Sequence, residues 1–334
     1  MIKKIFSIVL LALLFWSFSA TISHAKYQKL NVLEYQIDVQ KNGDMRITEL
    51  WDIYVEETNT LFKTFQIDNT YDRITDVTVS EMKGNEPVPF MPSDKYAYYV
   101  QKNYYQALKN PDNLFEIAWG VDITDTATRK YKLEYTVKNH VALYNDAAEI
   151  YWKLIDESSG IPCSRITGKI TLPEGITDLE DLKVWAHGPL NGNIQRVSTN
   201  QVYFEVTNLP SREFLEIRIL TPANIYPLSN KKVYEEKIGK VIEEETVWAN
   251  EANRKREIKR VVEEAVKVAT IVVSVILIGF YVLKIKKYQK ALKENPKLQP
   301  EQKYSYYRDI PDEKMSPAEA SFVYYFGRNG CPNE

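Results

Sequence analysis

Hydrophobic and polar positions alternate along most of residues 27–230, which is the pattern of β-strands with one buried face. The clearest example is a pair of alternating runs on either side of Asn42-Gly43, a dipeptide that tight hairpin turns favour. These runs contain Tyr35, Ile37 and Val39 before the turn and Met45, Ile47, Trp51, Ile53 and Val55 after it. The pattern predicts a β-hairpin at the start of a larger β-rich region.

Further alternating runs follow, separated by short segments rich in Gly, Pro and Asn. They lie at residues 131–137, 166–172, 202–206 and 215–219. Many short strands with such turns favour a β-sandwich over alternating helices and a parallel sheet. The segment Ser158–Pro162 interrupts the pattern, so we expect one or two sub-domains, with 26–160 as the first and 161–230 as the second.

Two segments are apolar enough to interact with a membrane. Residues 1–25 have the parts of a secretory signal: two lysines, an apolar run from Ile5 to Phe18, and small residues that permit cleavage after Ala25. The alternative is an uncleaved anchor, for which the run is short, since a span needs about 20 apolar residues. The second segment, Val268–Leu283, carries no charge and is bounded by lysines, which predicts a transmembrane helix over 265–285. A buried helix of a soluble domain is the alternative.

The segment before the second span, residues 231–264, combines many charges with apolar residues at helical spacing. We expect a helical stalk that acts as a spacer or as a pairing surface. The spacer is favoured because Glu245 and Lys255 break the apolar stripe. Basic residues flank the span on both sides and do not decide its orientation. The signal peptide does: it predicts residues 26–264 outside the cell membrane and the tail, 286–334, in the cytoplasm.

The tail contains Ser316-Pro317-Ala318-Glu319, a capping box with proline at the first helical position. We expect a short helix there, with Phe322, Val323 and Phe326 on one side. This side could dock on a partner, on the membrane surface or on the chain's own stalk, and the sequence does not choose between them.

Composition narrows the possible functions. The 43 basic and 45 acidic residues give a formal net charge of −2, so nothing favours binding to nucleic acid. The 23 Tyr, 12 Phe and 6 Trp suit the pleated surface of strands. Cys163 and Cys331 fall on opposite sides of the expected membrane and should not pair, so Cys163 is expected to be a small, partly buried residue. The three His are too few and too far apart for a metal cage, and no cofactor motif is present.

Three residues are candidates for a site. Glu49 shares a strand face with Ile47 and Trp51, where burial would make it a possible acid, although a structural role is favoured. Tyr98 and Tyr99 belong to an aromatic run that could form a binding platform, but packing is the more common use of such residues. No combination of residues forms a recognisable catalytic centre, so we expect no enzyme.

Several short stretches in the same order resemble one family. They are Val39–Asp44 with Ile47-Thr48-Glu49, then Glu149–Trp152, Gly168–Pro173 and Ser316–Ala320. Together they resemble the YciQ-like predicted bacterial membrane proteins, which are defined by domain of unknown function 2207. The resemblance implies a signal peptide, an extracytoplasmic β-domain and a membrane anchor, and it implies no activity. Family members are often longer, with further membrane helices.

The sequence therefore predicts a mainly β protein: an extracytoplasmic β-sandwich region, a helical stalk, one transmembrane helix and a short cytoplasmic tail. The first functional hypothesis is a binding module at the bacterial cell envelope, with an unknown protein or envelope polymer as partner. The second is a single-pass signalling or assembly subunit that couples the outer domain to the tail. The least favoured is an envelope hydrolase that uses Glu49 and a second carboxylate.

Overall fold

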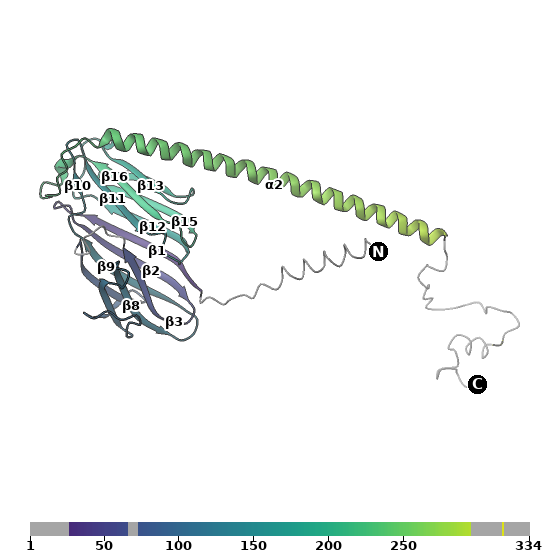
Figure 1. The fold of residues 1–334 in the computed structure, drawn as a ribbon, viewed down its shortest axis with the longest axis horizontal. Coiled ribbons are helices and arrows are strands. Elements are labelled where there is room, and N and C mark those ends of the chain that lie inside the picture. Colours follow the sequence, from purple (N-terminus) through teal and green to yellow (C-terminus); the bar gives the residue numbers. More distant parts are fainter. Residues whose placement is uncertain (1–26, 66–72, 295–315, 317–334) are drawn as a thin grey trace. The chain divides into compact units, whose positions relative to one another are not determined.

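The computed structural model describes residues 27–65, 73–294 and Ser316. Within these ranges the chain is mostly β, followed by one long helix (Figure 1). It divides into two units, Met1–Arg256 and Glu257–Glu334. The expected signal peptide lies outside the described residues, and so do Phe322, Val323 and Phe326 of the expected tail helix.

The largest sheet has eight strands in the order β14-β15-β12-β1-β2-β9-β4-β5. All neighbouring pairs are antiparallel except β1 and β12, which are parallel. The strands are β1 (Gln28–Val39), β2 (Met45–Val55), β4 (Ile74–Lys83), β5 (Glu86–Pro89), β9 (Ala127–Val137), β12 (Cys163–Thr171), β14 (Asn193–Ser198) and β15 (Gln201–Leu209).

The predicted hairpin is present at the centre of this sheet. Val39 at the end of β1 lies opposite Met45 at the start of β2. Gly43 in the turn has φ of +80°, a left-handed conformation that costs glycine little because it has no Cβ. A Cβ at this position would also come within 2.9 Å of Ser229 Oγ. Both the turn conformation and the close approach of the 229 segment therefore require glycine here.

Two smaller sheets have four strands each, in the orders β3-β8-β7-β6 and β10-β11-β16-β13. The first contains β3 (Thr58–Phe65), β6 (Met91–Pro92), β7 (Tyr104–Lys109) and β8 (Phe115–Ile123). The second contains β10 (Ala142–Leu143), β11 (Ala148–Ile155), β13 (Lys183–His187) and β16 (Leu215–Thr221). Of the two 3-10 turns, η2 (Leu179–Asp181) lies between β12 and β13, and η3 (Ala223–Ile225) lies between β16 and the helix that follows.

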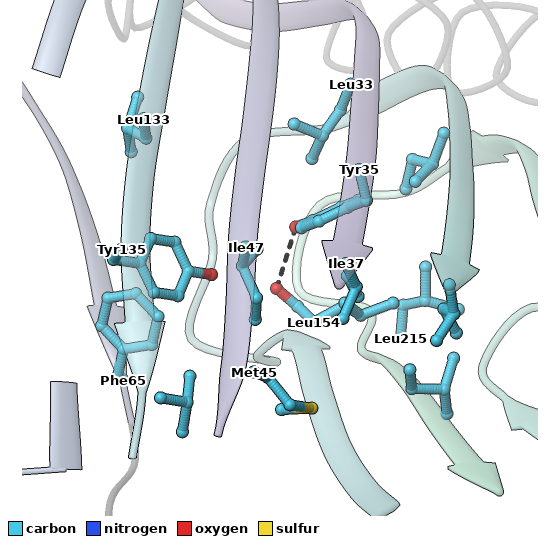
Figure 2. Close-up of a cluster of buried hydrophobic side chains, with 14 of the residues drawn as sticks. Leu33, Tyr35, Ile37, Met45, Ile47, Phe65, Leu133, Tyr135, Leu154 and Leu215 are labelled. Carbon is cyan, nitrogen blue, oxygen red and sulfur yellow. Dashed lines mark hydrogen bonds between the residues drawn. The ribbon is translucent and has the colours of Figure 1, made fainter. Parts of the chain in front are cut away.

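Both smaller sheets pack on the same face of the eight-stranded sheet. Trp51 on β2 contacts Trp119 on β8, with ring centroids 5.3 Å apart. The Tyr35 hydroxyl on β1 donates to the carbonyl of Leu154 on β11 at 3.0 Å, inside the cluster of buried side chains in Figure 2. The opposite face of β1 carries exposed polar residues, as the alternation predicts. The result is a two-layer β structure whose core lies between the large sheet and the two small ones.

The boundary expected near residue 160 between two sub-domains lies inside this two-layer β structure. β1 before it and β12 after it pair in parallel from Leu30 opposite Cys163 to Asp38 opposite Thr171. Buried side chains from both sides of residue 160 belong to one hydrophobic cluster. The segment around residue 160 therefore connects two strands that share a core.

Helix α2 (Ile238–Glu294) contains both the expected stalk and the expected span. It begins at Ile238 rather than at residue 231, because Asp146 caps it there: the backbone N–H groups of Lys237 and Ile238 donate to the Asp146 carboxylate at 2.7 and 2.9 Å. An 18-residue window of α2 has a mean hydropathy of 2.5, and none of it is buried. In the described part of the chain this is the one helix that is long and apolar enough to cross a membrane.

Candidate functional site

A buried ionic cluster lies where strand β3 of one small sheet meets strand β11 of the other. We call this boundary between the two small sheets the seam. Glu49 on β2 is 0% exposed and points to the core side of its strand, on the face predicted for it. Lys63 on β3 forms an ion pair with Glu49. The Lys63 ammonium also donates to the Tyr35 hydroxyl at 3.2 Å and to the Leu154 carbonyl at 3.0 Å. One lysine therefore connects β3, the large sheet and β11.

Neutral side chains donate the other hydrogen bonds that the Glu49 carboxylate accepts. Tyr135 donates to Oε1 at 2.6 Å and the Trp51 indole donates to Oε2 at 2.9 Å. Burial lowers the pKa of Lys63, and the negative charge of Glu49 offsets part of that effect. Burial and Glu49 together raise the pKa of Tyr35 well above its usual range. The three N–H donors of the Lys63 ammonium are matched by three acceptor atoms, so every donor has a partner. This geometry favours a structural role for Glu49 over a role as a catalytic acid.

A pocket of about 490 Å³ opens beside this cluster, and we call it the seam pocket. Its lining includes four aromatic residues and three serines, two of which belong to the 158–162 segment. The lining includes Tyr27, Tyr35, Trp51, Phe62, Lys63, Ser158, Ser159 and Ser211. A mostly apolar pocket of this volume with a few polar groups is typical of ligand sites.

Tyr98 and Tyr99 form a separate surface feature. Their side chains are 77% and 67% exposed, and their rings meet edge to face with centroids 4.9 Å apart. Neither lines the seam pocket. The structure therefore does not bring the two tyrosines together with Glu49 in one site.

A second buried ionic cluster, which we call the helix-base network, joins the start of α2 to β16 and β13. The Arg218 side chain, 3% exposed, pairs with Glu149 at 2.8 Å, Glu244 at 2.8 Å and Glu245 at 3.1 Å. His187 Nε2 lies 2.8 Å from Glu245. Five charged or titratable groups from three strands and one helix thus converge on one side of the sheet.

The electrostatics of this network keep His187 protonated at neutral pH. Burial by itself lowers the pKa of His187, but the nearby carboxylates of Glu216 and Glu245 outweigh burial and raise it to about 9. Reasoning from the sequence missed this network. The available signal was Arg218 inside the apolar run Leu215–Leu220, where a charged residue needs a buried partner.

Neither cluster resembles a metal site. Within residues 27–65 and 73–294, no group of three or more His, Cys, Asp or Glu side chains is arranged to hold a metal ion. Cys163 is a free, buried thiol, and burial raises its pKa to about 11, so it is unsuited to nucleophilic chemistry near neutral pH.

These features define a membrane protein with a β-rich domain and, among the residues that the structure describes, one candidate membrane-spanning helix. Residues 29–221, well over half of the chain, match the family described as predicted membrane protein (DUF2207) N-terminal domain. The chain belongs to this family, which confirms the resemblance seen in the sequence. No curated protein matches the chain.

Several solved structures are similar to the chain at low identity. A proposed protease from Parabacteroides distasonis has 10% identity and a TM-score of 0.35, over 57% of this chain and 40% of that one. A proposed nutrient-binding protein from Legionella pneumophila has 10% identity and a TM-score of 0.33, over 57% and 67%. An M1 zinc metallopeptidase from Deinococcus radiodurans has 8% identity and a TM-score of 0.31, over 57% and 42%. Similarity at this level carries no argument about activity.

Proposed function

We propose that this protein is a membrane-anchored binding module that takes its ligand into the seam pocket. The observation that carries the proposal is the pocket of about 490 Å³ between β3, β11 and the large sheet. Aromatic rings offer flat apolar surfaces for a side chain or a sugar ring, and the serine hydroxyls offer hydrogen bonds to its polar edge. A partner protein or an envelope polymer has both kinds of group.

The test is a binding measurement on the full chain in lipid nanodiscs, with isolated cell-wall polymer as the probe. Phe62, 55% exposed, belongs to the pocket wall, so Phe62→Ala should weaken binding about tenfold, the loss of one well-packed aromatic contact. Tyr98→Ala removes an even more exposed ring, at 77%, that lies away from the pocket, and it should leave binding unchanged. The reverse pattern would assign the binding surface to Tyr98 and Tyr99 and end the seam-pocket proposal.

The proposal includes a topology: residues 26–264 lie outside the cell membrane and 286–334 lie in the cytoplasm. The single candidate span in the described residues and the membership in a membrane-protein family support it. Protease treatment of intact spheroplasts tests it, with one tag before Lys29 and another after Glu334. Digestion of the first tag alone is expected, and protection of both would contradict the topology.

We also propose that the protein is not an enzyme. Glu49 has a complete set of partners and no exposed surface, so a substrate cannot reach its carboxylate without breaking the cluster. A hydrolase assay on cell-wall polymer should give the same background rate for the wild type and for Glu49→Gln. A rate that depends on this carboxylate would restore the hydrolase hypothesis.

The helix-base network favours a second candidate, a signalling or assembly subunit. It joins α2 to the β-domain through several charge-assisted hydrogen bonds, so a change in the domain could bias the helix. If this is the function, deletion of 316–327 abolishes the cellular phenotype while the protein stays in the membrane. If a binding module is the whole function, that deletion leaves ligand binding and phenotype intact.

A further inference from the structure

Two sheet edges border the seam pocket. β3 is the terminal strand of its sheet and pairs with β8 on one side. β11 pairs with β16 on one side, and on its other side β10 covers it only at Ala148 and Glu149. Among the residues that the structure describes, no strand pairs with the other side of β3, which we call its free edge, or with the matching side of residues 150–155.

The two edges meet at the seam without pairing. Strands that pair lie about 4.8 Å apart and are joined by backbone hydrogen bonds. Here a side chain makes the connection, since the Lys63 ammonium donates to the Leu154 carbonyl at 3.0 Å. The seam pocket of about 490 Å³ and a second cavity of about 310 Å³ are both lined by Lys63 and Thr64 of β3 and by Leu154 of β11. Open space therefore adjoins both strands at the seam.

The free edge of β3 offers backbone groups for hydrogen bonding. In an antiparallel pair, alternate residues direct their N–H and C=O groups to the partner strand and the residues between them direct theirs to the other side. β3 pairs with β8 residue by residue from Leu61 to Phe65, so alternate residues of this run present their backbone groups to the free edge. Apart from the pairing with β8, their backbone makes no hydrogen bond to a described residue.

β11 offers less for pairing. Its Leu154 carbonyl already accepts from the Tyr35 hydroxyl and from the Lys63 ammonium, both at 3.0 Å. Side chains thus satisfy this part of the β11 edge. Of the two strands, β3 is therefore the one that is able to accept a further strand.

The sequence of β3 does not block such pairing. β5, the terminal strand of the large sheet, contains Pro87 and Pro89 among four exposed residues, and proline has no N–H to donate. β3 contains no proline, and its one charged residue is Lys63. An inward-pointing charge is another way to protect an edge, but Glu49 compensates this one. The free edge of β3 therefore carries no uncompensated charge from its own strand.

We propose that the seam pocket receives an extended polypeptide segment of a partner protein, which pairs with the free edge of β3 as an added β-strand. This inference rests on the proposed function and names the class of ligand. A row of N–H and C=O groups along an edge is matched by the backbone of another extended chain, and pockets for alternate side chains then provide specificity.

The lining of the pocket predicts which side chains the segment carries. Successive side chains of a strand point to opposite faces, so every second one faces the pocket. The walls there include Phe62, Ile155 and Ile161. The charges in the lining are already paired, Lys63 with Glu49 and Asp156 with Lys153 at 3.7 Å. We therefore expect apolar residues at alternate positions of the bound segment.

The test measures the binding of synthetic peptides to the full chain in lipid nanodiscs. In each peptide threonine alternates with one apolar residue, which is valine, leucine or phenylalanine. Two copies of each are methylated on the backbone nitrogen, one at every threonine and the other at every apolar residue. Methylation removes N–H donors and keeps the side chains. Because only one alternate set of N–H groups faces β3, one copy should bind at least about tenfold more weakly and the other should bind nearly as well as the parent.

Hydrogen exchange locates the bound peptide. The parent peptide should slow exchange in residues 58–65, because the amides at the free edge of β3 then become hydrogen-bonded. Residues 86–89 of β5 form the control edge and should exchange at an unchanged rate. Slower exchange at β5 instead of β3 would overturn the assignment of the edge.

The other outcomes separate this inference from the proposed function. Equal binding of the parent and both methylated copies would overturn strand addition. If Phe62→Ala still weakened that binding, the seam pocket would remain the binding site. Binding of cell-wall polymer that depends on Phe62, with no peptide bound, would also overturn strand addition and leave the proposed function intact. The absence of binding to both polymer and peptides would overturn the two together.

Discussion

The seam cluster and the helix-base network both compensate buried charges, but they do so with different partners. The seam uses one lysine and one glutamate, and neutral tyrosine, tryptophan and carbonyl groups complete both shells. The helix base uses the forked guanidinium of Arg218 to collect three glutamates, one of which, Glu244, is 50% exposed. The first cluster ties sheets together, whereas the second ties a helix to a sheet.

This difference predicts how the stability of each cluster should respond to the loss of one charged side chain. Lys63 and Glu49 have side chains that are 10% and 0% exposed, so the loss of one leaves the other in the core without a charge partner. In the helix-base network Lys237 also lies 3.3 Å from Glu149, and His187 contacts Glu245. Alternative cations are therefore already in place there. We expect the seam to be the more fragile of the two.

The largest expected effect is that of Lys63→Met. It should lower the free energy of unfolding by about 3–5 kcal/mol, because Glu49 stays buried without its cation. Lys130→Met is the matched control: Lys130 is 62% exposed and lies 3.6 Å from Asp52, so the loss should stay below about 1 kcal/mol. Urea unfolding of both variants, followed by tryptophan fluorescence, provides the comparison. Equal losses would show that the seam pair contributes no more than a surface ion pair.

Arg218→Met should cost less, about 2–3 kcal/mol, because Lys237 and His187 still compensate part of the glutamate charge. The damage should also be local. Hydrogen exchange should speed up in the first turns of α2, whereas β1 and β2 should stay protected. Arg165→Met, at a surface pair with Glu205 where Arg165 is 55% exposed, is the control and should leave α2 unchanged. Faster exchange throughout the β-domain would contradict a local role.

Much of the fold could be predicted from the sequence because a period of two sets which side of a strand is buried. Ile47, Glu49 and Trp51 are buried on the face that the alternation predicts, and the Asn42-Gly43 turn joins β1 to β2. The span within α2 was also predicted, because an uncharged run between lysines has few other uses. Cys163 is more completely buried than expected, at 1% exposure.

The partners across layers could not be predicted. Alternation shows that Glu49 points inward, but it does not show that Lys63, from a strand in another sheet, meets it there. The start of α2 depends on Asp146, which is 91 positions away from Lys237 in the chain. Long-range contacts of this kind follow from the order of strands in the sheets, and the parallel pairing of β1 with β12 has no local signal in the sequence.

The smallest expected effect concerns pH and separates the two clusters once more. The folded state raises the pKa of His187 to about 9, above its value of about 6.5 in the unfolded chain. Folding therefore favours the protonated form, so this contribution to stability is complete below about pH 6.5 and is lost as the pH rises through 9. The groups that face His187 are Glu216, Glu245 and the rings of Tyr151 and Trp248.

His187→Gln should remove a stability difference between pH 6 and pH 10, measured by urea unfolding at each pH. The full shift corresponds to about 3 kcal/mol, and solvent screening of the partly exposed ring reduces it to on the order of 1 kcal/mol. Subtraction of the variant curve from the wild-type curve isolates His187, because Lys63 and the other titrating groups occur in both. His140→Gln should act in the opposite direction, because His140 stays neutral in the folded state but takes up a proton near pH 6.5 in the unfolded chain, so its removal should raise stability at pH 6 relative to pH 10. An unchanged curve for His187→Gln would mean that Arg218 alone balances Glu245, and the helix-base network would then resemble the seam in depending on a single cation.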